Sequence, residues 1–147
     1  MKILKRKGFT LTELIVSIVI AGILSIIAIP KIITWIHYSK VRQAAEELTS
    51  DLIWSQSLAM EKGSSKVVIN SDNYEIYAPA TNSTPIKTIS IDSPITLTPS
   101  FSGGTNYINF KRNKLPVQNG NITVSGYGIS YKITISAISG RIYLQRL

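Results

Sequence analysis

An apolar run near the amino terminus constrains what this chain can fold into more than any other feature. The run extends over 21 residues, from Phe9 to Ile29, and one acidic residue, Glu13, interrupts it. A helix rises about 1.5 Å per residue, so a helix over this run would roughly match the ~30 Å hydrocarbon core of a bilayer. A carboxylate in such a segment costs about 2.5–3.5 kcal/mol at its centre and less near its end. Glu13 therefore needs a partner, which makes it a candidate functional residue.

The residues before the run are basic. Lys2, Lys5, Arg6 and Lys7 precede Gly8, and this charge predicts a cytoplasmic amino terminus. A cleaved secretory signal peptide is the alternative, but it usually has a shorter apolar core and small residues at a downstream cleavage site. No such site ends this run. The chain has no cysteine, so an exported domain would depend on its apolar core for stability.

The stretch Gly8-Phe9-Thr10-Leu11-Thr12-Glu13 resembles the prepilin motif of the type IV pilin superfamily, which comprises type IV pilins, minor pilins and the pseudopilins of type II secretion. The resemblance implies cleavage by the prepilin peptidase between Gly8 and Phe9. It also implies methylation of the new amino terminus on Phe9. Residues 1–8 would then be a leader that the mature protein lacks.

The same resemblance implies a role for Glu13 in subunit assembly. Glu13 lies four residues after Phe9, on the same helix face, so it could pair with its own amino terminus. In the family it neutralises the terminus of a neighbouring subunit, since a buried charge must be paired. The resemblance also implies that Pro30 kinks the helix, because type IV pilins carry a proline at the matching place.

The helix is expected to resume after Pro30 and to extend to about residue 62. One apolar stripe repeats at helical spacing in its second half, at Val41, Ala45, Leu48, Leu52 and Ala59. Gly63 is the expected C-cap. The acidic residues Glu46, Glu47 and Asp51 are expected on a solvated flank. Trp35, His37 and Tyr38 follow the apolar block, as aromatic residues at a membrane interface do.

From Lys66 the apolar period changes to two, which predicts β-strands. Strands are expected at 67–69, 74–77, 86–91, 107–110, 122–124, 129–135 and 142–144, separated by proline- and glycine-containing turns such as Pro99. This spacing is typical of an antiparallel meander. We therefore expect an α+β, pilin-like fold in which a long N-terminal helix packs on a small antiparallel β-sheet domain. The expected parts are the leader 1–8, an apolar helix 9–38, an amphipathic helix half 39–62 and a β-rich domain 63–147.

A second resemblance, to the FimT and GspH branch of minor pilins and minor pseudopilins, involves the helix phrase 52–59 and the late Gly140-Arg141. The chain departs from that branch twice. Gln56-Ser57 replaces an Ala-Arg pair, and Phe110 opens a degraded form of the usual Phe-x-Pro-x-Gly.

Positive charge is concentrated in the last third of the chain. The net charge is +8, and no acidic residue follows Asp92. Some FimT-like minor pilins bind DNA through basic residues near a Gly-Arg motif, so the resemblance implies DNA binding here. The candidate residues are Lys111, Arg112, Lys114, Arg141 and Arg146. A solvated hairpin tip around Lys111 and a structural Arg141 are the alternatives.

The residue types argue against catalysis. The chain has no cysteine nucleophile and a single histidine, His37, and the predicted strands contain no pair of acids. We expect no enzyme activity, cofactor, metal or small-molecule substrate. Two functions remain open, a minor type IV pilin that primes or caps a pilus and takes up DNA, and a GspH-like minor pseudopilin of type II secretion. The partners would be other pilins, the prepilin peptidase and the bacterial inner membrane, before transfer to a periplasmic or cell-surface filament.

Overall fold

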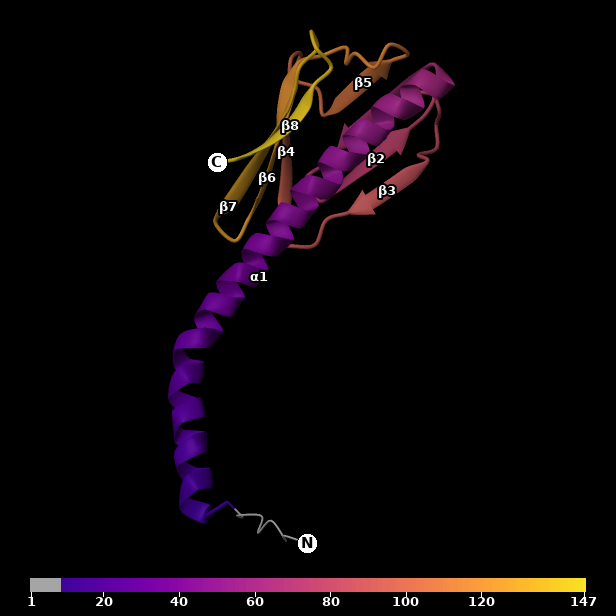
Figure 1. The fold of residues 1–147 in the computed structure, drawn as a ribbon. Coiled ribbons are helices and arrows are strands. Elements are labelled where there is room, and N and C mark those ends of the chain that lie inside the picture. Colours follow the sequence, from indigo (N-terminus) through magenta and orange to yellow (C-terminus); the bar gives the residue numbers. More distant parts are fainter. Residues whose placement is uncertain (1–8) are drawn as a thin grey trace, which may run out of the picture. The chain divides into compact units, whose positions relative to one another are not determined.

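The computed structural model describes residues 9–147, so Gly8 and the rest of the leader lie outside the described residues. The chain forms two compact units, of which the first ends at Ile36 and the second is His37–Leu147. One helix, α1 (Leu11–Lys62), contributes to both units (Figure 1). Its bounds agree with the helix predicted over about residues 9–62.

In the first unit α1 exposes large apolar side chains all around its circumference, from Leu11 to Ile36. A helix that is apolar on every side needs to be covered by lipid or by other helices. Three hydroxyl groups of this part of the helix are already satisfied, because Ser17, Ser25 and Thr34 each donate to the carbonyl four residues earlier. No single described helix qualifies as a membrane span by length and composition, whereas Leu11–Ile26 and Ala28–Lys62 qualify together as a bent pair.

The second unit contains eight antiparallel strands in two four-stranded sheets (Figure 1). The first sheet has the order β3-β2-β1-β5, and the second has the order β4-β6-β7-β8. The strands are β1 (Ser64–Ile69), β2 (Asn73–Tyr77), β3 (Lys87–Ser90), β4 (Thr96–Phe101), β5 (Tyr107–Lys111), β6 (Gly120–Gly126), β7 (Ile129–Ile135) and β8 (Ile142–Arg146).

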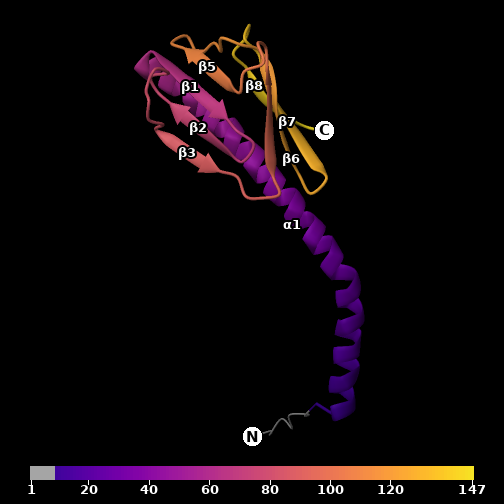
Figure 2. The same cartoon turned by 180° about the vertical axis from the view of Figure 1, so that it is seen from behind.

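The core of the second unit forms where the C-terminal half of α1 packs against both sheets (Figure 2). All five residues of the predicted helical stripe are fully buried there. They meet alternate residues of the strands, among them Val67, Ile108 and Ile133. Gly63 ends the helix with φ of 90°, the left-handed conformation expected of a C-cap glycine. The α+β fold predicted from the sequence is therefore confirmed.

Two details of the predicted sheet were wrong. The sequence pattern does not predict β4, because Pro99 indicates a strand boundary. Proline cannot donate a ladder hydrogen bond, but β4 is an edge strand, where that donor is not needed. The strands also do not form one continuous meander. They divide after β3 into the two sheets, and β5 returns to pair with β1.

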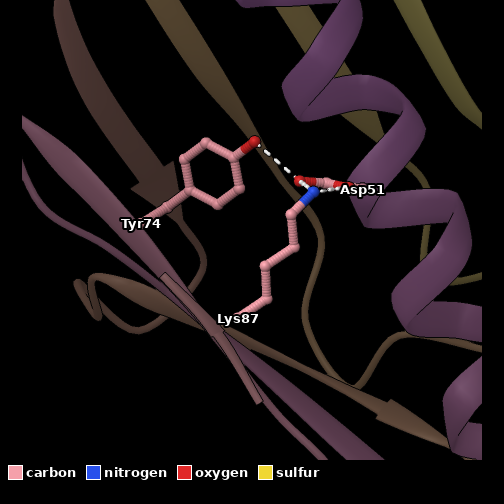
Figure 3. A network of polar contacts seen from close by, with 3 residues as sticks. All are labelled: Asp51, Tyr74 and Lys87. Carbon is pink, nitrogen blue, oxygen red and sulfur yellow. Dashed lines mark hydrogen bonds and ion pairs between the residues drawn. The ribbon is translucent and has the colours of Figure 1, made fainter. Parts of the chain in front are cut away.

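The expectation that Asp51 lies on a solvated flank is also wrong. Asp51 is only 8% exposed. Its carboxylate accepts hydrogen bonds from the Lys87 Nζ at 2.7 Å and from the Tyr74 hydroxyl at 2.8 Å (Figure 3). Burial and this hydrogen bond raise the pKa of Tyr74 well above its ordinary value. A buried carboxylate needs such partners, and here they join α1 to β2 and β3.

His37 and Tyr38 pack against the sheet domain, which differs from the interfacial position expected for them. The ring of His37 stacks on Tyr127, and the ring of Tyr38 lies against Tyr131 at a centroid distance of 6.2 Å. Trp35, in the first unit, stays exposed. The aromatic residues after the apolar block thus belong to different environments.

Candidate nucleic-acid interface

Three of the predicted basic residues lie in one tight turn after β5. The Lys114 N–H donates to the Lys111 carbonyl at 2.9 Å, and the Lys111 N–H donates to Leu115 at 3.0 Å. Lys114 has φ of 66°, a left-handed conformation that usually belongs to glycine at this place in a hairpin. The turn exposes the side chains of Lys111, Arg112 and Lys114 to solvent.

The fourth basic residue, Arg141, follows the loop between β7 and β8. The Gly140 N–H donates to the Ser136 carbonyl at 2.8 Å, and the Ser136 N–H donates to Arg141 at 3.0 Å. Gly140 has φ of 67°, so its conformation also favours glycine. Ile138 at the tip of this loop is 89% exposed, and Arg141 is exposed beside it.

A side chain of α1 joins these two segments. The Gln56 Nε2 donates to the Lys114 carbonyl at 3.1 Å and to the Gly140 carbonyl at 2.7 Å. The segments also pack closely, because a Cβ at Gly140 would lie 3.3 Å from Leu115 Cδ2 and 3.4 Å from the Lys114 carbonyl. The structure thus brings Lys111, Arg112, Lys114 and Arg141 to one corner of the domain, which we call the basic corner.

The fifth predicted residue, Arg146, lies at the other end of β8. It is five residue steps from Arg141 along the extended strand, about 17 Å at 3.4 Å per residue. Its guanidinium is 4.9 Å from the centroid of the Tyr38 ring, a cation–π contact. Arg146 is therefore separate from the basic corner, although the sequence placed it in the same group.

The charges of the basic corner are not neutralised by the protein. The three ion pairs in the part of the chain that the structure describes are Arg42–Glu46, Lys62–Glu61 and Lys87–Asp51. None of them uses a residue of the basic corner. Strands β4 to β8 and their connections also lack acidic residues. Four exposed cations without counter-charges are well suited to bind phosphate groups.

At the other end of the chain, Glu13 caps the start of α1. The Glu13 N–H donates to Thr10 Oγ1 at 3.2 Å, and the Thr10 N–H donates to Glu13 Oε2 at 3.4 Å. This reciprocal pair is a capping box, and the pattern Thr-x-x-Glu could have revealed it in the sequence. Glu13 thus has a structural partner within its own chain, in addition to any partner in an assembly.

Two known family models match this chain, one near its amino terminus and one over the end of α1 and the sheet domain. Residues 3–29 match the prokaryotic N-terminal methylation motif, and residues 44–140 match the family described as type II transport protein GspH. The chain belongs to the GspH family. The predicted membership of the type IV pilin superfamily is therefore confirmed. The GspH match includes Gln56, the Lys111–Lys114 turn and Gly140, and it ends just before Arg141.

The fold of this GspH-family chain is shared with a solved minor pilin. The crystal structure of the type IV minor pilin FimU from Pseudomonas aeruginosa superimposes with a TM-score of 0.60 at 16% sequence identity. The likeness covers 76% of this chain and 92% of FimU. At this identity it establishes the fold alone. No curated protein matches the sequence.

A cavity of about 240 Å³ lies between α1 and the β3–β4 connection, and charged residues of both signs line it, among them Lys40, Glu47 and Asp92. Within residues 9–147, no three histidine or acidic side chains lie close enough together to hold a metal ion. In contrast to the mixed lining of this cavity, the basic corner carries charge of one sign.

Proposed function

We propose that this chain is a minor pilin, a structural subunit that helps to prime or cap a type IV pilus and binds DNA through its basic corner. The prepilin peptidase would cleave between Gly8 and Phe9, and Phe9 would be methylated. The protein would be held in the bacterial inner membrane by a single span with a cytoplasmic amino terminus, and then be extracted into the filament.

Assembly with other pilins is supported by the first half of α1. Its apolar side chains are exposed on all sides, so they need lipid before assembly and neighbouring helices after it. Glu13 would pair with the amino terminus of a neighbour on Phe9. Pro30 cannot donate a hydrogen bond to Ile26, and this weakness supports local opening of the helix during assembly.

DNA binding is supported by one observation, the convergence of four unpaired cations at the basic corner. Their two segments come from different sheets, and Gln56 holds them together. Binding to phosphates without sequence preference needs little more than such a cluster, with dissociation constants typically in the range of about 10⁻⁴–10⁻⁶ M. The left-handed Lys114 adds support, because strained residues concentrate at functional sites.

The test is DNA binding by the full chain in micelles of an uncharged detergent, titrated against salt. We expect micromolar binding that weakens steeply as salt rises. The double variant Arg112→Ala/Lys114→Ala should bind more weakly and should reduce the slope of log K against log salt by about 2. The matched control Lys40→Ala/Arg42→Ala removes one lysine and one arginine that are exposed on α1, away from the basic corner, and should leave the slope almost unchanged. Absence of binding at low salt would exclude the DNA-binding role.

A GspH-like subunit of type II secretion is the second candidate, and the family description supports it. In that role the sheet domain would contact other pseudopilins or secreted proteins. The two candidates differ in the phenotype of a deletion strain. Loss of pili and DNA uptake with normal secretion would favour the pilus, whereas loss of secretion with normal DNA uptake would favour the secretion system.

A further inference from the structure

We infer that Gln56 is a positioning residue of the basic corner, because its amide holds the two basic segments in the arrangement that binds a polyanion. The inference rests on the proposed function. It assigns a role in DNA binding to a side chain that is uncharged, 8% exposed and located on α1, whereas the cations belong to segments at the end of β5 and just before β8.

The geometry of the amide carries the argument. A glutamine amide nitrogen has two N–H groups, and in Gln56 each has one carbonyl acceptor, Lys114 at 3.1 Å and Gly140 at 2.7 Å. Both acceptors belong to residues in the left-handed conformation, with φ of 66° and 67°. The two turns therefore present their carbonyls to the same side chain, and the strained conformation of Lys114 has a partner that accounts for it.

The sheets themselves provide no such connection. The Lys111–Lys114 turn follows β5, the edge strand of the first sheet, whereas Gly140 precedes β8, the edge strand of the second. No ladder joins these edges. Among the described residues, no other hydrogen bond links the turn directly to the Ala137–Gly140 loop. Without the Gln56 amide, packing around Leu115 would still join the two segments directly, and the Asn119 side chain, five residues after Lys114, would still accept a hydrogen bond from the Ala137 N–H.

This connection matters for binding because separate cations lose freedom when they engage one polyanion. When the segments are already fixed in the folded protein, their conformational entropy is not lost on binding. Affinity is then higher without any new contact. The number of phosphates neutralised depends on the cations alone. Loss of the Gln56 amide should therefore reduce affinity and leave the salt dependence unchanged.

The first measurement tests the connection without DNA. The chain has no cysteine, so Arg112→Cys and Ile138→Cys provide two unique sites for spin labels. In the full chain in uncharged detergent, the distance distribution between the labels should be narrow. Gln56→Met keeps a side chain of similar size without a donor, and it should broaden the distribution. The control Gln43→Met makes the same change at an exposed position of α1 and should leave the distribution narrow.

The second measurement is DNA binding by the unlabelled Gln56→Met and Gln43→Met chains. Loss of these two partly buried hydrogen bonds should weaken binding by Gln56→Met about threefold to tenfold, with the salt slope of the native chain. Gln43→Met should bind like the native chain. Melting temperatures of both variants would show whether the domain remains folded under the binding conditions.

The outcomes separate the inference from the proposed function. A distance distribution that stays narrow in Gln56→Met, or native affinity despite a broadened distribution, overturns the inference alone. A reduced salt slope in Gln56→Met also overturns it, because cations would then have been lost from the interface. A native chain that does not bind DNA overturns the proposed function, and the binding role of Gln56 with it.

Discussion

The imidazole ring of His37 on α1 stacks on the phenol ring of Tyr127 in the β6–β7 turn, with centroids 3.9 Å apart and an interplanar angle of 11°. Tyr127 and Gly128 form a two-residue hairpin turn, and Tyr127 has φ of 53°. Asparagine or glycine is usual at such a position, because the left-handed conformation costs other residues roughly 1–2 kcal/mol. The contact with His37 offsets part of that cost and ties the turn to the helix.

The stack predicts unequal effects for its two partners. His37→Ala should destabilise the domain by about 1 kcal/mol, because it removes an aromatic pair worth about 0.5–1.5 kcal/mol. Tyr127→Asn removes the same pair but also the backbone strain, so it should be close to neutral. Urea unfolding of the full chain in detergent measures both. A Tyr127→Asn chain as unstable as His37→Ala would show that the turn is not strained.

The buried phenol of Tyr74 predicts a loss of stability at alkaline pH. Its pKa is raised in the folded state, above the ordinary value of 10.0. Above pH 10 the unfolded chain therefore releases this proton while the folded chain keeps it. The stabilisation is complete below about pH 10 and decreases as pH rises further, by about 1 kcal/mol at pH 11.

The stability of Tyr74→Phe should therefore decrease less steeply than that of the native chain between about pH 9 and pH 11. At neutral pH this variant lacks the hydrogen bond to Asp51. The urea midpoint as a function of pH measures the difference. Tyr143→Phe changes an exposed tyrosine and should retain the alkaline slope of the native chain. Equal slopes for the native chain and Tyr74→Phe would contradict the prediction.

Replacement of Lys114 by glycine is expected to increase the stability of the domain and to weaken DNA binding. Lys114→Gly should stabilise the domain by about 1 kcal/mol, because glycine adopts φ of 66° without strain. The same change removes one cation of the basic corner, so DNA affinity and the salt slope should fall. Thermal melting and DNA titration measure the two effects. An increase in stability without any loss of affinity would show that Lys114 does not contact the polyanion.

The capping box predicts that the two roles of Glu13 can be separated. Glu13→Leu should leave leader cleavage largely intact and block incorporation into filaments, because it removes the charge that we propose to pair with the amino terminus of a neighbour. Thr10→Ala should weaken the helix start by about 0.5–2 kcal/mol but retain the carboxylate, and so permit incorporation. Immunoblots of sheared filaments and of membranes measure incorporation and cleavage. Normal incorporation of Glu13→Leu would exclude the assembly role.

Periodicity in the sequence was sufficient to predict the long helix and seven of the eight strands. The apolar residues from Val41 to Ala59 repeat at helical spacing, which predicts one buried helix face, and they are fully buried. Local patterns could not predict β4, because Pro99 is acceptable only once a strand is known to lie at a sheet edge. They also could not predict that Asp51 is buried, because its partners Tyr74 and Lys87 come from distant strands.

The candidate site was predictable in part. The cations of the basic corner are evident from the charge distribution, but their convergence is not. It depends on a neutral glutamine whose two acceptors are backbone carbonyls, which carry no residue-specific signal. Arg146 was grouped with them only because it is near in sequence, and the extended geometry of β8 separates it from Arg141.

The hydroxyls of Ser17, Ser25 and Thr34 donate to carbonyls of their own helix, and this has a consequence for how subunits can align. Between Leu14 and Pro30 the helix offers a neighbour no charge and no free hydroxyl donor, so sliding along its axis by one turn exchanges one set of aliphatic contacts for a similar set. Such a surface can hold neighbouring helices together, but it does not fix their axial register. Within the first half of α1, groups able to fix the axial position of one subunit relative to the next lie at the ends of this segment, where Glu13 and Lys31 carry its nearest charges.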